Sequence, residues 1–394
     1  MRKVFYALSA LAVTLLSGCG DSNKGSSKPT SGSGTNGTQV ANTTELDRKL
    51  FSQIKLAGEH VTPWRGYAFK SVPLYFVHSK ENQAQEAYIF NPTKLHSGSR
   101  PVSDKESNGL AIHQYNDGAV AALDKLKSGN GLFEFKYGLY GDNYYLQSYT
   151  SHQVDIDHIL STPSVTLAYH EAFHLYQEKH FQRPEYYQQL AFDKFNEYPI
   201  NEEMLTLKLM VLERFKSLPI VNLDKEQVKQ QLKEYVVLVD EMLRIDTSKV
   251  DDFKSGYIYK HALGQELYEG SAMMVDTLMS RDVLPLHKEK RFNVFEPTKL
   301  NEEQHGFIKL KNKQAVIDYF AFEMFYDSGS AIIWLLLEDG VDYKQFEKGL
   351  YPYDIAKQRV DISEQDAYYL LQELKNSEAW EAANKAAKKY MSLK

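Results

Sequence analysis

The sequence predicts an α+β protein in which a small mixed α/β N-terminal part precedes a larger, mainly helical part. Residues 45–160 contain short β-like runs separated by turn signals. From residue 161 onward, the apolar residues recur with the period of a helix. The chain has 394 residues, 43% of them hydrophobic, which suffices for about two domains with cores of their own. We therefore expect an N-terminal α+β domain at 45–160 and a helical domain at 161–394.

Residues 1–18 are typical of an export signal. Arg2 and Lys3 give a positively charged start, and a mostly apolar stretch follows that is too short for a comfortable membrane span. The stretch ends in Leu16-Ser17-Gly18-Cys19, which resembles the lipobox of bacterial lipoproteins. The resemblance implies cleavage before Cys19 and attachment of lipid to its thiol.

Cys19 is the one cysteine of the chain, so intramolecular disulfides and a cysteine-rich metal cluster are excluded. A conventional cleavage site that happens to contain a cysteine is the alternative interpretation. Several acyl chains on one residue give a stable membrane anchor. We expect the protein to be lipid-anchored in the bacterial cell envelope. In a Gram-negative cell the outer membrane is favoured, because Gly20 rather than an aspartate would be the second mature residue.

Residues 19–44 form the link between the lipid and the folded body. After Cys19 they are mainly Gly, Ser, Thr and Asn, with very few apolar side chains. Such a segment cannot bury enough surface to order itself. We therefore expect a flexible tether here.

The expected elements of the folded body follow from local periodicity and turn signals. In the N-terminal part we expect strands at 73–77, 87–90, 132–135 and 144–149 and a short helix at 119–127. In the second part we expect helices at 163–181, 201–217, 225–245, 257–280, 314–338, 363–375 and 377–391. The first of these has Thr162 and Pro163 at its start, where threonine suits the N-cap and proline the first turn.

The first long helix carries the motif H-E-x-x-H, at His170, Glu171 and His174. Two histidines four residues apart lie one turn apart on one helical face, so both imidazoles can reach one zinc ion. Glu171 projects beside the open position of such an ion, where it can act as a general base. With 12 histidines in the chain, the composition predicts only about 0.03 chance occurrences of this pattern. The motif therefore favours a Zn²⁺ site over a chance match on a surface helix.

A third zinc ligand must come from elsewhere in the chain. Leu267-Tyr268-Glu269-Gly270-Ser271-Ala272 resembles the N-E-G-x-A segment of gluzincin metallopeptidases, a superfamily that includes thermolysin-like enzymes and aminopeptidases. The resemblance implies that Glu269 is the third ligand. Glu266, one turn earlier, is the nearest rival, and Glu202 or Glu203 could supply the ligand if their helix folds back.

A second segment also resembles the gluzincins. Phe325-Tyr326-Asp327-Ser328-Gly329-Ser330-Ala331 is similar to their Y-x-K-G-x-A stretch, which implies that the Tyr326 hydroxyl stabilises the oxyanion of the reaction. His261 or Tyr319 would be the donor if Tyr326 only packs in the core. No G-x-M-E-N segment precedes the helix of the motif, so an endopeptidase is at least as well supported as an aminopeptidase.

The sequence thus predicts a zinc-dependent metallopeptidase of gluzincin type, with one Zn²⁺ held by His170, His174 and Glu269. In this hypothesis Glu171 takes a proton from the zinc-activated water and gives it to the leaving amine of a peptide or protein substrate. A net charge of −6, with no long basic run, argues against a nucleic-acid partner. Two alternatives remain: a catalytically silent lipoprotein that binds a peptide or envelope partner, and a structural metal site, which would need four protein ligands.

Replacing Cys19 tests the anchor. Cys19→Ser should abolish labelling by palmitate and either release the protein from the membrane fraction or leave it uncleaved, because no other residue of the chain can form the thioether. Metabolic labelling followed by cell fractionation measures both effects, with Ser17→Ala as the control. Label that persists on the Cys19→Ser protein would exclude lipidation at this position.

Overall fold

The computed structural model describes residues 40–129, 131–154, 163–284, 294–295 and 310–394. The export signal, Cys19 and nearly all of the expected tether lie outside the described residues. The chain divides into two compact units: unit 1 comprises residues 1–59 and 68–172, and unit 2 comprises residues 60–67 and 173–394. Unit 1 contains a sheet and unit 2 is mainly helical, so the predicted α+β class is confirmed.

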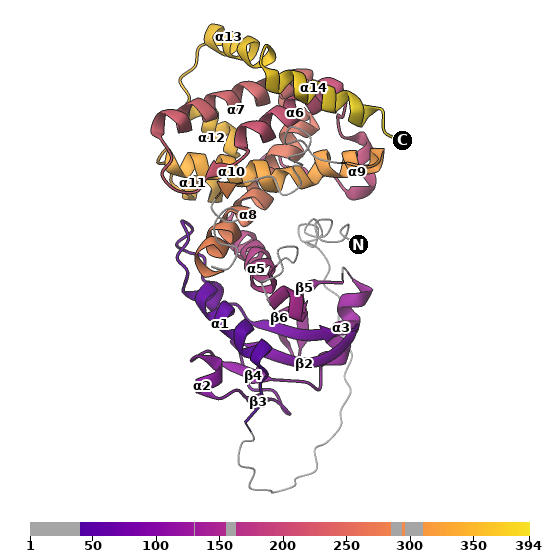
Figure 1. Ribbon diagram of the computed structural model, residues 1–394, viewed down its shortest axis with the longest axis vertical. Helices are drawn as coiled ribbons and strands as arrows, with labels where there is room; N and C mark the ends of the chain where they lie inside the picture. Colours follow the sequence, from indigo (N-terminus) through magenta and orange to yellow (C-terminus); the bar gives the residue numbers. More distant parts are fainter. Residues whose placement is uncertain (1–39, 130, 155–162, 285–293, 296–309) are drawn as a thin grey trace, which may run out of the picture. The chain divides into compact units, whose positions relative to one another are not determined.

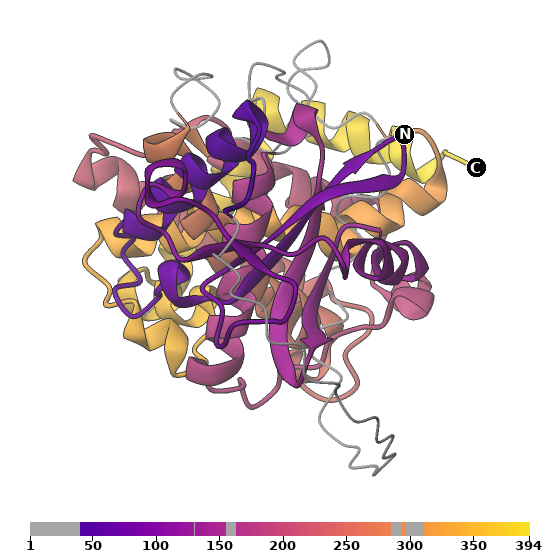
Figure 2. The ribbon, with the colours of Figure 1, turned by 90° about the horizontal axis from the view of Figure 1, so that it is seen from below.

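Unit 1 is built on a six-stranded sheet with the strand order β3-β4-β2-β1-β6-β5 (Figures 1 and 2). β1 pairs with β2 and β5 with β6 as antiparallel neighbours, whereas β1 and β6 run parallel. The predicted strands correspond to β1, β2, β5 and β6; β3 and β4 are too short to show an alternating pattern. The strands are β1 (Leu74–Lys80), β2 (Gln83–Phe90), β3 (Arg100–Pro101), β4 (Ile112–Gln114), β5 (Phe133–Leu139) and β6 (Asp142–Tyr149).

Both faces of this sheet are apolar, because successive side chains of its central strands alternate between two cores. Tyr75 and Val77 of β1 belong to the core that includes α3 (Ala119–Ser128), the predicted short helix. Phe76, between them, meets Phe90 edge to face in the other core, with ring centroids 5.7 Å apart. The sheet is therefore covered by helices on both sides.

α1 (Glu45–Glu59) covers the second face of the sheet and was not predicted. Its Phe51 ring meets the rings of Tyr88 and Phe90 edge to face. Its buried Asp47 accepts hydrogen bonds from the hydroxyl groups of Tyr88 and Tyr149, at 2.7 and 3.0 Å. The buried residues Leu50, Phe51, Ile54 and Ala57 of α1 have helical spacing, and β-like segments follow them in the sequence.

The strand β6 leads through α4 (Ser151–Val154) to α5 (Ser164–His180), the helix of the H-E-x-x-H motif. Gln147 of β6 donates hydrogen bonds to the carbonyl oxygen and the hydroxyl of Ser164, at 2.9 and 2.8 Å. The first residue of α5 is thereby fixed to the end of the sheet. Unit 1 also contains η2 (Phe69–Ser71) and α2 (Asp104–Ser107).

Unit 2 contains helices at every position where the sequence predicts one after α5 (Figure 1). The predicted helix 257–280 begins with a segment that has π-helical hydrogen bonding, and the predicted helix 314–338 contains such a segment at Tyr319–Glu323. The short helices Lys344–Glu347 and Pro352–Arg359 were not predicted. The elements are η3 (Phe192–Glu197), α6 (Glu202–Phe215), β7 (Leu218–Pro219), α7 (Lys225–Ile245), η4 (Phe253–Ser255), η5 (Ile258–Ala262), α8 (Leu263–Val283), β8 (Val294–Phe295), α9 (Lys313–Asp318), η8 (Tyr319–Glu323), α10 (Met324–Glu338), α11 (Lys344–Glu347), α12 (Pro352–Arg359), α13 (Glu364–Lys375) and α14 (Glu378–Met391).

The helices α8 and α10 touch through their backbones at two glycines. A Cβ atom added to Gly270 would lie 2.4 Å from the Cα of Gly329, and one added to Gly329 would lie 2.5 Å from the carbonyl oxygen of Glu266. No side chain fits at either position. The glycines of the two segments that resemble the gluzincins are therefore the crossing point of these helices.

A buried histidine connects the π-helical segments that precede α8 and α10. The Nε2 atom of His261 in η5 donates to the carbonyl oxygen of Ala321 in η8 at 2.7 Å, and its Nδ1 atom accepts from the backbone N–H of Leu190 at 3.0 Å. Burial lowers the pKa of His261 to about 4, in keeping with a neutral ring. His261 thus holds the starts of the two helices in a fixed relation.

The continuous helix Lys313–Glu338, formed by α9, η8 and α10, is long and apolar enough to cross a membrane by length and composition. Within the described residues it is the one helix with this property, and 83% of its most apolar stretch is buried inside the protein. A core helix of a globular protein meets the same criterion, so this is weak evidence for a membrane span.

The glycine crossing predicts a large cost for a single methyl group. Gly329→Ala should lower the free energy of unfolding by about 3 kcal/mol, because the new Cβ meets backbone atoms that cannot move aside independently. Chemical denaturation followed by circular dichroism measures this effect. Gly138→Ala in β5, where a Cβ meets no atom within 4 Å, is the control. Equal stability of the two variants would contradict a tight crossing.

Candidate metal centre

The motif histidines are held in place by the apolar side of α5. Ala168, Ala172 and Phe173 are at most 1% exposed, which fixes the rotation of the helix. His170 is itself 5% exposed, and the His174 side chain is 10% exposed. Both imidazoles are therefore largely withdrawn from water, as metal-binding side chains usually are.

The structure brings together His170, His174 and Glu269. One ligand atom from each side chain can be chosen so that all three atoms lie within 4.8 Å of one another. Among the residues that the structure describes, this is the one group of three or more His, Cys, Asp or Glu side chains with such spacing. It is a buried group that could bind a metal ion, and it contains the glutamate proposed from the resemblance to the gluzincins.

The contact between His174 and Glu269 has the length that a shared metal ion requires. The Nε2 atom of His174 lies 3.3 Å from the Oε2 atom of Glu269. Two ligand atoms that are each about 2.0–2.1 Å from a tetrahedral Zn²⁺ lie roughly 3.3 Å apart. The distance between these two atoms is therefore compatible with one shared ion.

Gln177, one turn after His174, is a residue of the site that the sequence analysis missed. Its Oε1 atom lies 2.7 Å from the Nδ1 atom of His174, and its Nε2 atom donates to the carbonyl oxygen of Tyr268 and to the hydroxyl of Ser271, each at 2.8 Å. Gln177 follows His174 by three residues, so both side chains lie on the same face of α5. This spacing is the feature of the sequence that could have identified it.

Glu171 is 2% exposed and belongs, with Tyr145 of β6, to unit 1. Burial raises the pKa of Tyr145 well above its usual range, and the nearby carboxylate of Glu171 raises it further. The Tyr145 hydroxyl donates to Oε1 of Gln147 at 2.7 Å. Glu171 thus has a polar neighbour in a site that is otherwise withdrawn from water.

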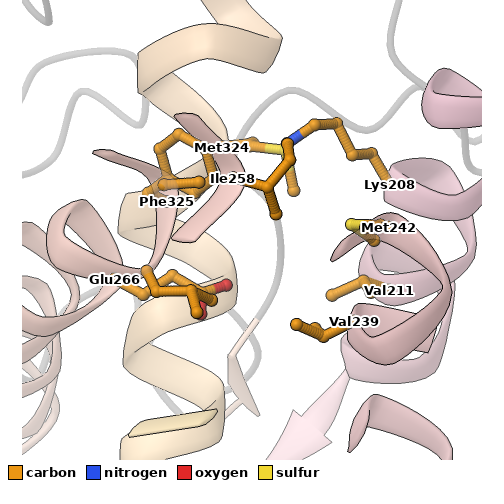
Figure 3. Close-up of a pocket in the computed structure, with 10 residues that line it drawn as sticks. Lys208, Val211, Val239, Met242, Ile258, Glu266, Met324 and Phe325 are labelled. Carbon is orange, nitrogen blue, oxygen red and sulfur yellow. The ribbon is translucent and has the colours of Figure 1, made fainter. Parts of the chain in front are cut away.

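Glu266, the rival ligand, belongs to a different buried cluster. It accepts a hydrogen bond from the hydroxyl of Ser328 at 2.6 Å and another from the hydroxyl of Tyr235. It faces a cavity of about 10 Å³, the size of one water molecule, which Lys208 also lines (Figure 3). Burial raises the pKa of Glu266, while these two hydroxyls and Lys208 oppose the rise. Its partners therefore hold it in a structural network.

Lys208 provides the positive charge of this second cluster. It is 1% exposed, and its Nζ atom donates to the hydroxyl of Tyr198 at 2.8 Å. Figure 3 shows the same nitrogen beside Met324, whose sulfur is 3.6 Å away. Burial lowers the pKa of Lys208 to about 7, although the carboxylates of Glu266 and Asp246 work in the opposite direction. Removal of Glu266 would leave this amine without its main counter-charge.

The other residues considered as ligands or donors have contacts of their own. Glu202 lies in the first turn of α6, where Asn384 donates to it at 3.3 Å and Lys388 is 3.6 Å away. Tyr326 is 4% exposed, and its ring meets Phe322 edge to face. The hydrogen-bonding atoms of His261 contact Ala321 and Leu190, so they are not directed at a substrate. The hydroxyl of Tyr319 donates a hydrogen bond to Asp327 at 3.5 Å. Glu203, at the start of α6, is exposed.

Comparison of the chain with protein-family models, with curated proteins and with solved structures finds no match. The likeness to gluzincins therefore consists of the three short segments described above.

A matched pair of variants on α8 tests the ligand assignment. Glu269→Gln should weaken Zn²⁺ binding by more than about 100-fold, since an anionic ligand is lost, whereas Glu266→Gln should leave affinity within about threefold because its cluster is separate. Both changes preserve the size and shape of the side chain and replace one acceptor oxygen by an N–H donor group. Competition with a chromophoric chelator measures the affinity. The reverse order of effects would move the third ligand one turn along α8.

Proposed function

We propose that this protein is a zinc-dependent metallopeptidase that hydrolyses peptide bonds and is anchored to the bacterial cell envelope by lipid on Cys19. The observation that carries the proposal is the buried group of His170, His174 and Glu269, with Glu171 beside the first histidine on the same helix. These residue types together supply a metal site and a base, the two requirements of metal-assisted hydrolysis.

The donor set favours zinc. Two imidazole nitrogens and one carboxylate oxygen are the ligands of many catalytic zinc sites, which keep a fourth position open. When bound, the ion would supply Lewis acidity to the scissile carbonyl group. A closed structural site would need a fourth protein ligand, and the group among the described residues has three members.

The residues of the chain would divide the remaining chemistry between them. The carboxylate of Glu171 would accept a proton from the attacking water and deliver it to the nitrogen of the leaving amine. Its burial keeps bulk water from competing for that proton. A hydroxyl donor, which we assign to Tyr326, would bind the oxygen that becomes negative in the transition state.

A second candidate function is a lipoprotein that binds a peptide or an envelope partner without catalysis. The same 3.3 Å contact is compatible with it, because an ion pair between His174 and Glu269 would need no metal ion. Metal content distinguishes the two functions. The purified wild-type protein should contain about one Zn²⁺ per chain if it is a metallopeptidase.

Replacement of the base should separate catalysis from metal binding. Glu171→Gln keeps the size of the side chain and removes its ability to take up a proton. Zinc content should stay the same. The turnover number should fall by about 10²–10⁴-fold. Mass spectrometry of a digested peptide library, with zinc content determined on the same samples, measures both quantities. A binding module would show no cleavage by either protein.

Removal of one hydroxyl tests the role of Tyr326. Tyr326→Phe should lower kcat by about 10²–10³-fold with little change in KM or zinc content, as expected for the loss of a donor that acts only in the transition state. Tyr319→Phe, seven residues away and also buried, is the matched control and should retain near wild-type kcat. Wild-type turnover of Tyr326→Phe would show that Tyr326 only packs in the core.

A further inference from the structure

We propose that Gln177 is the positioning residue that prepares His174 and Glu269 to share one cation. The inference rests on the proposed zinc site. It concerns how the protein orients the side chains of His174 and Glu269 in the absence of the ion. Gln177 is 3% exposed and lies on α5, one turn after His174.

The orientation of the Gln177 amide follows from its partners on α8. The hydroxyl of Ser271 donates to the carbonyl oxygen of Leu267 at 2.6 Å, so its oxygen is available as an acceptor toward Gln177. The carbonyl oxygen of Tyr268 can only accept. Both N–H groups of the Gln177 amide are therefore used on α8, and its Oε1 atom must point toward His174.

The amide orientation in turn selects the tautomer of His174. Since Oε1 of Gln177 can only accept, the Nδ1 atom of His174, 2.7 Å away, must carry the proton. In the neutral ring, Nε2 then presents a lone pair to the carboxylate of Glu269 at 3.3 Å. A metal ion between these two atoms, or a second proton on the ring, would make this contact favourable. The hydrogen bonds of Gln177 therefore fix Nε2 as the ring atom that faces Glu269, in the position from which both side chains can bind one ion.

The same amide also places Glu269. Tyr268 and Ser271, its two acceptors, flank Glu269 on α8, while its oxygen contacts the ring of His174 on α5. One side chain thereby sets both the protonation pattern of one ligand and the position of the other. Partners of this kind, which touch a ligand rather than the metal, typically contribute about 10–100-fold to metal affinity.

The test compares four variants of the full-length chain, purified in detergent. Gln177→Leu removes the whole amide, and Gln177→Glu keeps an acceptor for His174 but places a carboxylate oxygen against the carbonyl of Tyr268. Ser271→Ala removes one acceptor on α8 and leaves the contact with His174. Gln230→Leu, on the exposed side of α7, is the matched control.

Three quantities are measured on each protein. Competition with a chromophoric chelator gives the Zn²⁺ dissociation constant, and thermal unfolding without metal gives the stability. Imidazole ¹⁵N NMR of the metal-free protein gives the tautomer of His174. The last two readouts do not depend on catalytic activity.

We expect Gln177→Leu to raise the zinc dissociation constant about 10–100-fold and to lose the preference for Nδ1–H in His174. Gln177→Glu should be the least stable protein without metal, yet bind zinc more tightly than Gln177→Leu, because the acceptor at Nδ1 is retained. Ser271→Ala and Gln230→Leu should stay within about threefold of wild type. A purely structural role would instead make zinc affinity follow stability.

The outcomes separate this inference from the proposed function. If wild type binds zinc and Gln177→Leu binds it equally well, or if zinc affinity follows metal-free stability across the series, the positioning role is wrong and the zinc site stands. If wild type binds no zinc, both the metallopeptidase and the role of Gln177 in preparing its site are wrong. An Nε2–H tautomer in metal-free wild type would also overturn the inference.

Discussion

The close crossing of α8 and α10 at Gly270 and Gly329 is the constraint on which the arrangement of unit 2 depends. Because neither position has room for a side chain, the two helices are held at backbone contact distance, and the rotation of α8 about its axis is fixed. Glu266 then faces α10, where Ser328 donates to it. Glu269, three residues on and about 60° around the helix, is directed to His174 instead.

Two buried glutamates on neighbouring sides of one helix thus have different tasks. Burying a carboxylate is costly unless charge or hydrogen bonds compensate it. For Glu266 the compensation comes from Lys208 and two hydroxyls, and the cluster is complete within the protein. For Glu269 the neighbouring ring presents a position that a cation would fill, with Gln177 behind the ring. The cluster around Glu266 therefore stabilises the fold, whereas the group that contains Glu269 could bind a metal ion.

The π-helical segments before α8 and α10 contribute to the same geometry. Single turns of π-helix insert an extra residue and are often found near functional sites. Here they are joined by the neutral ring of His261, which donates to Ala321 and accepts from Leu190. The starts of the helices are therefore tied together by His261, as their middles are by the glycines, so the side chains of α8 are presented in one defined orientation.

The sequence by itself determined what depends on local periodicity. It predicted the α+β class, the main helices, and the placement of His170, Glu171 and His174 on one helix, because helical spacing acts over neighbouring residues. The helix α1 was not predicted, although its apolar residues have helical spacing, because the segments that follow it have the pattern of strands. Only the resemblance favoured Glu269 over Glu266, because the two side chains differ by only about 60° around α8. That choice, and the pairing of Gln177 with His174, depend on which helices pack against α8, and such long-range contacts exist only in the tertiary structure.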